Sequence, residues 1–344
     1  MEPASESLRK ARAPATRDIV ERLKIVTPKM IRLVNHPIEH PTAAFNPALA
    51  LYGDKVYLLP RVGFGYYTYT SSIALIELDV PELLDRSTRV FNAEINIHPS
   101  IKEDAWGAED PRAAIIYDTP AVTYTGRASN YFDTGRWTYK TVPITAVKLD
   151  GGWVKKVVFK TICSDGVVSD KDAVLFEYEG RLYLLHRIRT LSNEYKTIAS
   201  RIDNSLLFNP GLTIARITAW REVLKPEAWE SKLGWGTQPF EVDGELVVLV
   251  HAIDNDGIVY RVFAASIEPT ETGVRVKAVT PTYIMEPRET YEVIGDRPLV
   301  VFPCGAIVVD DKIIVSYGAA DLVFGIGVID SSTLLSELDK GVLL

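Results

Sequence analysis

The sequence predicts an all-β fold, a five-bladed β-propeller that spans residues 1–344 as one domain. Three observations predict it: five copies of one hairpin pattern, a second turn later in each copy, and few stretches with helical periodicity. Alternating apolar and polar residues are typical of half-buried strands, and four-stranded sheets repeated around an axis are the blades of a propeller. An internal repeat of this kind sets the whole fold.

Each of the five hairpins has an apolar strand, an acidic or glycine-containing turn, and a second apolar strand. The turns are marked by Asp54, Asp118, Glu179, Asp243 and Asp310, at separations of 64, 61, 64 and 67 residues. Each copy also has a second turn, marked by Asp79, Asp150, Asp203, Glu268 and Asp330. Two hairpins give four strands per copy, so five copies fill the chain.

The last copy is too short to complete a blade, because only 34 residues follow Asp310. We therefore expect residues 1–30 to form an N-terminal extension. A strand within residues 24–35, near the sequence KMIRLV, should close the last blade. Closure of this kind protects the edges of the sheets.

Composition and charge exclude several classes of protein. The chain carries 38 basic and 45 acidic residues and a formal net charge of −7, whereas a general nucleic-acid-binding protein needs a broad positive face. The first residues contain no apolar run long enough for a signal peptide or a membrane span. Cys163 and Cys304 have no metal-type spacing. We expect a cytoplasmic protein without a metal or an organic cofactor, and the sequence leaves homo-oligomer formation open.

Hairpin geometry brings polar residues from different copies together. A strand rises about 3.3 Å per residue, so positions seven or eight residues before and after a turn lie together at the far end of the hairpin. These positions are occupied by Asn46, Asp110, Lys171 and Trp235 before the turns, and by Arg61, Thr125, His186 and His251 after them, with Arg127, Arg187 and Asp321 nearby. Because the residues differ from copy to copy, we interpret this mouth of the central channel as a functional site.

The same residues resemble a known family. The segments FNPAL with Arg61, EDPR, DKDAVLF with YLLHR, and VFPCGAIVVDDKIIVSYGAADLVFGIG are similar to glycoside hydrolase family 130, from about Asn46 to Gly327. The resemblance implies β-mannoside phosphorylases, with some β-mannosidases, on a five-bladed propeller. LHRIR replaces the usual LHRP, and YTGRASNYFDTGRW departs from the family pattern, which affects acceptor recognition.

The resemblance also implies roles for individual residues. Asp110 corresponds to the general acid, which passes its proton to the glycosidic oxygen through a hydroxyl group of the bound mannose. Positions that bind sugar are Asn46, Arg61, His186 and Asp321, and we add Glu109, Arg112, Asp172 and Tyr260 to the substrate-binding set. Positions that hold phosphate are Lys171 and Arg187, together with His251 and Arg127. Aromatic candidates for stacking on sugars are Tyr131, Phe132, Trp235 and Tyr260.

The chemistry can be argued from the residues themselves. Cleavage of a glycosidic bond needs a proton donor and a nucleophile on the opposite face of the ring. Glu109 and Asp110 are adjacent on a strand and point to opposite faces, so they do not form one acid/base pair. We expect burial or a neighbouring negative charge to raise the pKa of Asp110, unless the relay through the sugar lowers that demand.

The nucleophile separates two reactions. An inverting hydrolase places a second carboxylate about 6.5–9.5 Å from the first to activate water, and the candidates for it are Asp172, Glu177, Asp254 and Asp321. Phosphate is already an anion and needs only a cationic cradle. We therefore expect inverting phosphorolysis of β-mannosides to α-mannose 1-phosphate and a shortened acceptor, with inorganic phosphate as co-substrate. An inverting β-mannosidase and a non-catalytic glycan-binding propeller are the alternatives.

Overall fold

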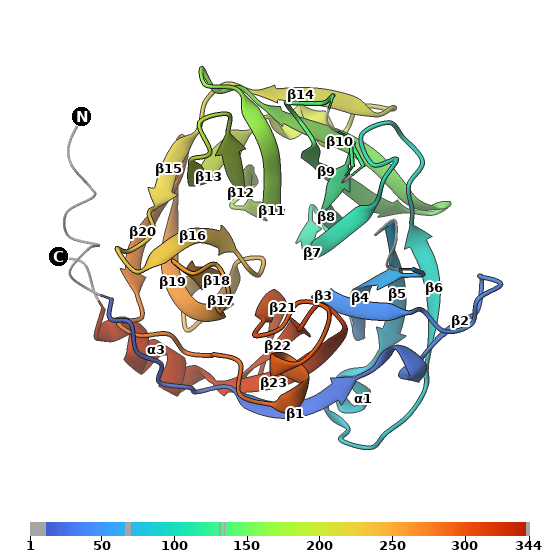
Figure 1. The fold of residues 1–344 in the computed structure, drawn as a ribbon, viewed down its shortest axis with the longest axis vertical. Coiled ribbons are helices and arrows are strands. Elements are labelled where there is room, and N and C mark those ends of the chain that lie inside the picture. Colours follow the sequence, from blue (N-terminus) through green and yellow to red (C-terminus); the bar gives the residue numbers. More distant parts are fainter. Residues whose placement is uncertain (1–11, 66–69, 131, 134, 342–344) are drawn as a thin grey trace.

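The computed structural model describes residues 12–65, 70–130, 132–133 and 135–341. Within these ranges the chain forms 23 strands and three short α-helices, so the prediction of an all-β protein is confirmed. Strand pairing gives four sheets, of which the nine-stranded one consists of two groups joined by a single pairing. The strands thus form five groups, which Figure 1 shows arranged around a central axis. We number these groups from the first to the fifth along the chain.

The first two groups are antiparallel meanders, each with one additional parallel strand. The first group consists of β3 (Ala43–Tyr52), β4 (Lys55–Gly63), β5 (Ser71–Leu78) and β6 (Phe91–Ile97), with β2 (Ile31–Leu33) beside β6. The second group consists of β7 (Ala108–Ile116), β8 (Thr119–Arg127), β9 (Thr141–Leu149) and β10 (Gly152–Thr161), with β14 (Thr213–Ile217) beside β10.

The other three groups are antiparallel throughout. The third group consists of β11 (Val167–Tyr178), β12 (Arg181–Thr190), β13 (Tyr195–Ile202) and β15 (Arg221–Leu224). The fourth consists of β16 (Glu230–Trp235), β17 (Phe240–Val242), β18 (Glu245–Asp254), β19 (Tyr260–Thr270) and β20 (Gly273–Val279). The fifth consists of β21 (Val301–Val309), β22 (Lys312–Ala319), β23 (Val323–Asp330) and β1 (Glu21–Val26). One parallel pairing, Ser169 with Thr141, joins the second and third groups into a continuous sheet.

All five predicted first hairpins are present, and their turns use a left-handed backbone. Between β7 and β8, Tyr117 and Asp118 have φ angles of 48° and 58°. Between β11 and β12, Glu179 and Gly180 have φ angles of 49° and 72°. Two consecutive residues with positive φ are typical of type I′ turns, whose twist matches that of the two strands they connect. Four of the five acidic residues that marked the repeat adopt the positive φ that these turns require, and in the first hairpin Gly53 adopts it instead of Asp54.

The predicted second turns are only partly correct. Asp150 lies in a hairpin turn between β9 and β10, as expected. Asp79 and Asp330 instead cap the helices α1 (Val80–Leu84) and α3 (Ser331–Asp339), and Asp203 caps a short 3-10 helix. Glu268 lies inside β19, whose turn begins three residues later. Aspartate favours helix N-caps as well as turns, so the residue type alone does not distinguish them.

A strand from the beginning of the chain closes the fifth group, but it starts earlier than predicted. β1 (Glu21–Val26) pairs antiparallel with β23. The predicted KMIRLV segment instead provides β2, which pairs with β6 in the first group. A 3-10 turn at Pro28–Met30 separates the two strands. Because proline cannot donate a ladder hydrogen bond, the chain leaves the fifth group at this turn and continues to the first.

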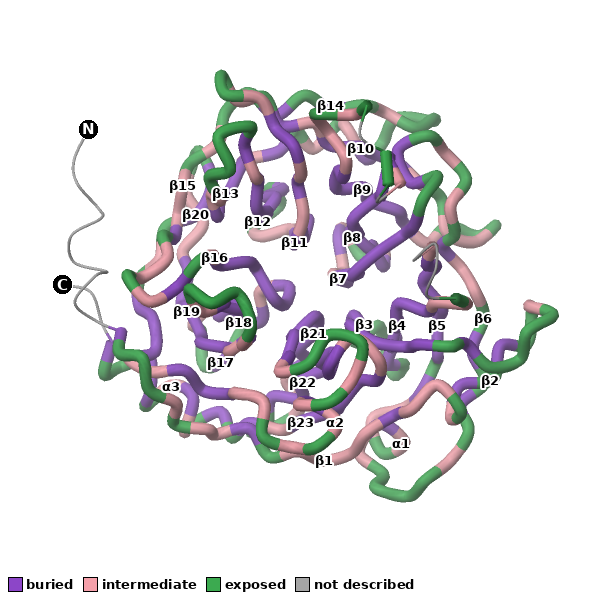
Figure 2. The backbone as a smooth tube through the Cα atoms, viewed as in Figure 1, coloured by how far each residue is buried: buried purple, intermediate pink, exposed green. Residues whose placement is uncertain are grey.

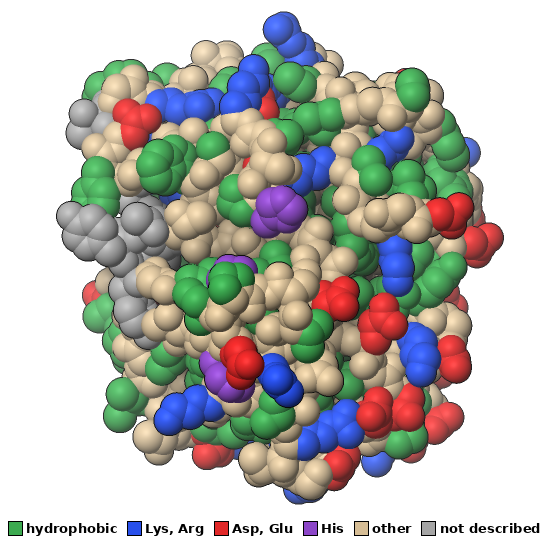
Figure 3. Space-filling view, turned by 90° about the vertical axis from the view of Figure 1, so that its right-hand side faces the viewer, with side chains coloured by type: hydrophobic (Ala, Val, Ile, Leu, Met, Phe, Trp, Pro, Cys, Tyr) green, Lys and Arg blue, Asp and Glu red, His purple; other side chains and the backbone are tan. Residues whose placement is uncertain are grey.

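Apolar layers between neighbouring groups form the core. Each of the five contacts around the ring has its own buried cluster, for example Leu59 with Val122 between the first and second groups, and Val56 with Ile314 between the first and fifth. Burial of one such aliphatic side chain contributes about 1.5–3 kcal/mol. Figure 2 shows the buried backbone along the inner strands and the exposed backbone mainly at the outer turns. The face in Figure 3 carries acidic and basic side chains interspersed, without one broad basic patch.

Candidate active site

Three polar residues occupy corresponding positions at the inner ends of the first three groups. Asn46, Asp110 and Asp172 have φ angles of 47°, 48° and 51°. Each lies within a β-bulge, where the register between the first and second strands of its group shifts. Asparagine and aspartate adopt the left-handed backbone more readily than most residues. The bulges therefore explain both the residue types and their repeated position.

Two glycines leave space for these side chains. At Gly318 in β22, a Cβ atom would overlap the side-chain oxygen of Asn46. At Gly234 in β16, it would overlap the carboxylate of Asp172 and the ring of His251. Any larger residue at either position would displace a polar group of the site.

The inner ends of the groups surround a cavity of ≈ 180 Å³. Most of its lining is charged or polar, and it includes seven of the residues predicted from the hairpin pattern and three from the wider predicted set. The lining residues are Asn46, Arg61, Glu109, Asp110, Lys171, Asp172, Arg187, Lys232, His251, Tyr260, Arg297, Val300, Phe302 and Asp321.

Asp110 is held by two donors from the first group. Its Oδ1 accepts hydrogen bonds from Asn46 Nδ2 at 2.8 Å and from Arg61 Nη1 at 2.9 Å. Burial favours a higher pKa, but the charges of Arg61 and Lys171 outweigh it, so the pKa of Asp110 lies below its ordinary value. The expectation of a raised pKa at Asp110 is therefore wrong for the substrate-free chain.

Asp321 shows the opposite behaviour on the same cavity. Burial, reinforced by the negative charge of Asp110, raises the pKa of Asp321 to about 6, although Arg61 and Arg297 oppose the change. When two carboxyl groups share a site, the one with fewer compensating donors keeps its proton to higher pH. Asp321 is therefore the carboxyl group of this pair that is protonated first as the pH falls.

Glu109 binds three cationic side chains. Its carboxylate lies 3.0 Å from Arg61 Nη2, 2.7 Å from Arg127 Nε and 3.0 Å from Lys171 Nζ. Burial opposes ionisation, yet these charges hold the pKa of Glu109 well below its usual range. Arg127 does not line the cavity, and its Nε donates to Glu109 Oε1. The structure therefore shows Arg127 bound to Glu109, outside the lining of the predicted phosphate site.

Cationic side chains from the third and fourth groups and from the loop before β21 line the other side of the cavity. These are Lys171, Arg187, Lys232 and Arg297. Burial, with the nearby charges of Arg187 and Arg297, lowers the pKa of Lys232 to about 7. An ammonium group whose pKa is lowered in this way lacks solvent and a sufficient counter-charge, and an anion in the cavity would provide that charge.

Asp172 orients two of the predicted phosphate ligands. Its Oδ2 lies 2.7 Å from Arg187 Nε and 3.4 Å from His251 Nε2. Burial opposes ionisation, but Arg187 and His251 hold the pKa of Asp172 well below its usual range. Burial also lowers the pKa of His251, so this ring is neutral at pH 7. Its buried Nδ1 has no hydrogen-bond partner among the described residues and can bind a ligand group.

Two further predicted substrate ligands lie away from the cavity. The Nδ1 of His186 lies 2.9 Å from Asp170 Oδ1, and its Nε2 lies 3.3 Å from Ser200 Oγ. His186 and Arg187 are neighbours on β12, so their side chains point to opposite faces, and only Arg187 reaches the cavity. Arg112 is buried and donates to backbone carbonyls, including that of Gly236 at 2.8 Å. Neither residue lines the cavity in the structure.

Among the aromatic candidates, only Tyr260 lines the cavity. Trp235 is fully buried, and its indole nitrogen donates to the carbonyl of Ile198 at 3.0 Å. Phe132 is exposed, and Tyr131 lies outside the described residues. Thr125 is buried behind the site.

Two of the four acids considered for a hydrolase also lie elsewhere. Glu177 accepts a hydrogen bond from the backbone of Gly180 in the hairpin turn, at the far end of β11. Asp254 accepts one from the backbone of Ile258 in the turn after β18. Neither residue lines the cavity, which leaves Asp172 and Asp321.

The sequence pattern missed Lys232, Arg297 and Phe302. Lys232 and Arg297 lie outside the five first hairpins, whose residues predicted the site. A signal for Lys232 was present, because it is two residues before Gly234 and so shares a face of β16 with it. Phe302 packs on the ring of His251, with centroids 4.4 Å apart.

Two further features are absent from the described residues. These residues contain no group of three or more His, Cys, Asp or Glu side chains arranged to hold a metal ion. No helix in the described ranges has the length and apolarity needed to cross a membrane.

Comparison with known proteins gives concordant matches. A family model described as beta-1,4-mannooligosaccharide phosphorylase matches residues 9–340. Two phosphorylases of Thermoanaerobacter sp. (strain X514) each cover 88% of this chain and 97% of their own length: a 1,2-beta-oligomannan phosphorylase at 29% identity and a beta-1,2-mannobiose phosphorylase at 26%. The solved beta-1,2-mannobiose phosphorylase from Listeria innocua superposes with a TM-score of 0.65 at 20% identity, covering 93% of this chain and 99% of that one.

Proposed function

Because the chain belongs to glycoside hydrolase family 130, we propose that it is an inverting phosphorylase that cleaves β-mannosides with inorganic phosphate. Its family and its curated relatives identify it as a glycoside phosphorylase. The mannoside substrate and the roles of the site residues are the proposed part. Of the structural observations, the cationic wall of the cavity carries this proposal, because Lys171, Arg187, Lys232 and Arg297 line it together and can surround an anion.

The two sides of the cavity suit the two partners of a phosphorolysis. Asn46, Arg61 and Asp110 belong to the first two groups, and we assign to them the mannose unit and its glycosidic oxygen. Lys171 and Arg187 belong to the third group, and we assign to them the phosphate. Arginine can bind a phosphate through two parallel hydrogen bonds, whereas lysine supplies a point charge.

Inversion follows from this arrangement. A phosphate oxygen attacks the anomeric carbon from the side of Lys171 and Arg187, and the bond from that carbon to the acceptor oxygen breaks. The acceptor oxygen takes the proton that starts on Asp110 and passes through a mannose hydroxyl. A β-linkage attacked from its opposite face gives α-mannose 1-phosphate.

Phosphate also prepares the acid in this mechanism. Without substrate, Arg61 and Lys171 keep the pKa of Asp110 low. A phosphate bound at Lys171 neutralises part of that positive charge, and the bound sugar removes the remaining water. Both changes raise the pKa of a carboxyl group, so Asp110 gains its proton only when both partners are bound.

The other carboxyl groups of the cavity are poorly suited to act as the base that activates water in a hydrolase. Glu109 and Asp172 are each bound to cationic side chains at 3.0 Å or less, which lowers their basicity. Asp321 carries a raised pKa and lies beside Asp110, which suits a sugar ligand that exchanges protons with it.

We also propose that the five strand groups are the blades of a five-bladed β-propeller. The pairings divide the strands into five groups, and Figure 1 shows them radiating from one axis. An apolar cluster lies between each neighbouring pair of groups, as expected for blades packed face to face.

The reverse reaction tests the proposed function. The enzyme is incubated with α-mannose 1-phosphate and a panel of acceptors that includes mannose, glucose, β-1,2-mannobiose and β-1,4-mannobiose. Phosphate release that requires an acceptor supports the proposal and ranks the acceptors. The absence of acceptor-dependent release across the panel would contradict it.

A further inference from the structure

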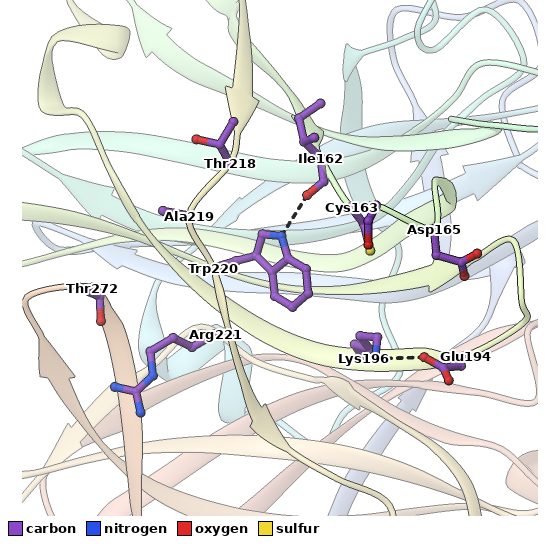
Figure 4. A pocket seen from close by; sticks show the side chains of 11 residues that line it. Ile162, Cys163, Asp165, Glu194, Lys196, Thr218, Ala219, Trp220, Arg221 and Thr272 are labelled. Carbon is purple, nitrogen blue, oxygen red and sulfur yellow. Dashed lines mark hydrogen bonds and ion pairs between the residues drawn. The ribbon is translucent and has the colours of Figure 1, made fainter. Parts of the chain in front are cut away.

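A hollow of ≈ 850 Å³ lies at the outer rim of the third group (Figure 4). It contains Trp220, whose indole nitrogen donates to the carbonyl of Ile162 at 3.0 Å, and the Lys196–Glu194 ion pair. This hollow shares no lining residue with the active-site cavity, so it is separate from the candidate site. By contrast, Arg112 contacts three of the residues that line the cavity without lining it itself.

The side chain of Arg112 binds three backbone carbonyls that belong to two groups of strands. Its Nη1 donates to the carbonyl of Asp110 on β7 at 2.6 Å. Its Nη2 and Nε donate to the carbonyls of Trp235 and Gly236, where β16 ends, at 3.0 and 2.8 Å. Because the guanidinium is planar and rigid, it holds these carbonyls in a fixed arrangement. Arg112 therefore joins the second group to the fourth.

The bulge at Asp110 needs a hydrogen-bond donor of this kind. The register between β7 and β8 shifts between Glu109 and Arg112, so Asp110 and Pro111 lie outside the regular ladder. A buried carbonyl without a partner is unfavourable, and Arg112 supplies the partner. Since this carbonyl belongs to the proposed acid itself, its hydrogen bond fixes the backbone from which the carboxyl group projects.

Arg112 also lies next to the phosphate side of the cavity. Its Nη2 lies 3.9 Å from Asp172 Oδ1, and Asp172 in turn orients Arg187 and His251. Burial opposes ionisation of Asp172, but Arg187 and His251, with a contribution from Arg112, hold its pKa well below the usual range. The strand that Arg112 binds at its end, β16, carries Lys232. Arg112 thus contacts elements from both sides of the site.

We propose that Arg112 is a positioning residue for the reaction, which holds the backbone of Asp110 in place relative to Asp172 and to the strand that carries Lys232. A displaced acid protonates the leaving oxygen poorly, even when the nucleophile is correctly aimed. Arg112 acts through Asp110, since its own side chain does not reach the cavity. The inference rests on the proposed role of Asp110 and is independent of the nucleophile.

Arg112→Lys tests this inference, because lysine keeps the charge but loses the planar set of donors. On the β-mannoside that the wild type cleaves fastest, kcat should fall roughly ten- to a hundredfold, as expected for a small displacement of a reacting group. The KM for the mannoside should change much less, because Arg112 does not line the cavity. A wild-type kcat in Arg112→Lys would overturn the inference. Failure of this variant to fold would assign Arg112 to stability alone and would overturn it as well.

Gln238→Met is the matched control. Gln238 is also buried and donates to backbone carbonyls of two groups, those of Leu49 at 2.9 Å and Ala306 at 2.6 Å. None of these three residues lines the cavity. Gln238→Met should therefore lower the unfolding temperature and leave kcat unchanged. A loss of kcat as large as that of Arg112→Lys would show that any weakened link between groups slows the enzyme, which contradicts a specific role for Arg112.

Combination with Asp110→Asn separates positioning of the acid from any other effect of Arg112. If Arg112 acts through Asp110, Arg112→Lys should lower the turnover of the Asp110→Asn chain by less than about threefold, because residues that act as a unit are not additive. Losses that multiply would overturn the inference and leave the proposed function untouched. Near-normal turnover of Asp110→Asn alone would contradict the proposed acid, and the inference with it. Cleavage that needs no phosphate would contradict only the proposed nucleophile.

Discussion

Asp110 and Asp321 are carboxyl groups on one cavity whose pKa values move in opposite directions. Two donors, Asn46 and Arg61, bind the carboxylate of Asp110, and its pKa is lowered. Burial beside that negative charge raises the pKa of Asp321 to about 6. The site thus keeps one carboxylate ready to change its protonation state when ligands arrive.

Replacement of Asp110 tests its role as the acid. Asp110→Asn should lower turnover by on the order of 10² or more, because a general acid is lost. Folding and phosphate binding should persist, and a thermal scan and a phosphate titration check both. Near-normal turnover would assign the acid to another carboxyl group, and Asp321→Asn would then be measured first.

The lowered pKa of Lys232 predicts a pH dependence of anion binding. Sulfate keeps a constant charge from about pH 5.5 to about pH 9, so changes in its affinity report the protein. Below the Lys232 pKa of about 7, the ammonium is already charged in the empty site. Above that pKa, Lys232 is neutral in the empty site and must be protonated when sulfate binds. The affinity for sulfate should therefore fall by up to about tenfold per pH unit.

Lys232→Arg provides the control, because an arginine stays protonated throughout this range. Inhibition of the Lys232→Arg variant by sulfate should be nearly independent of pH between neutrality and about pH 9. Any change with pH that wild type and variant share is not due to Lys232. His251, whose pKa burial lowers, is neutral over the same range. An identical pH dependence in wild type and Lys232→Arg would show that another group is responsible.

At the residue scale, strand alternation decides which sequence predictions hold. His186 and Arg187 both follow the third turn at a suitable distance, but only one face of β12 reaches the cavity. The number of residues from a turn predicts at which end of the hairpin a residue lies. It does not predict which face of the strand carries its side chain. Arg127 lies behind Glu109 for a different reason, since only the three-dimensional packing shows which side of that carboxylate it approaches.

At the element scale, β16 contributes to the site mainly through the missing side chain at Gly234. Gly234 lies opposite His251 in the sheet and leaves space for the carboxylate of Asp172. The neighbouring Lys232 enters the cavity from the same strand. A short strand thus provides both a cation and the space in which Asp172 orients Arg187 and His251.

Gly234→Ala should therefore damage the site without removing any charged group. The added methyl group forces Asp172 and His251 to move, at a cost of about 1–3 kcal/mol. We expect a lower unfolding temperature and weaker phosphate binding. Gly211→Ala is the matched control, because a Cβ atom there meets no atom within 4 Å. If both variants behave alike, close packing at Gly234 has no role in the site.

The first hairpins could be predicted because their turns require particular residues. Asp118, Glu179 and Asp243 each adopt a positive φ, which few residue types tolerate, so the sequence records the turn. The second turns carry the same residue types for other reasons. Asp330, for example, accepts a hydrogen bond from the backbone of Thr333 and begins α3, which no strand pattern predicts.

At the scale of the whole molecule, an apolar layer lies between each pair of neighbouring groups all the way around the ring. The layer between the fifth and first groups includes Val26 of β1 together with Phe324 and Ile326 of β23. β1 therefore contributes to the core as well as covering the edge of β23. The beginning of the chain is part of the ring that holds the inner strand ends in place.

Removal of residues through Val26 should destabilise the entire chain. The truncation exposes the edge of β23 and removes a buried aliphatic side chain, which alone costs about 1.5–3 kcal/mol. Thermal unfolding should occur several degrees lower and in one transition. An unchanged unfolding temperature would mean that β1 is a dispensable addition to a ring already closed.

The whole-molecule architecture was more accessible from sequence than the complete cavity. A regular spacing of turns predicts equivalent units, and a single distance rule places one end of each unit at the centre. Arg297 escapes this rule because it lies in the long connection before β21, where no repeat defines its position. Its contact with the ring of Tyr260, at 4.4 Å, exists only once the chain is folded.

The dependence of product on phosphate tests the central claim most directly. The enzyme is incubated with β-1,2- and β-1,4-mannobiose, with and without inorganic phosphate, and the first products are separated and identified. The cationic wall formed by Lys171, Arg187, Lys232 and Arg297 predicts α-mannose 1-phosphate, formed only when phosphate is present. Free mannose released at the same rate with and without phosphate would contradict this account and identify an inverting mannosidase.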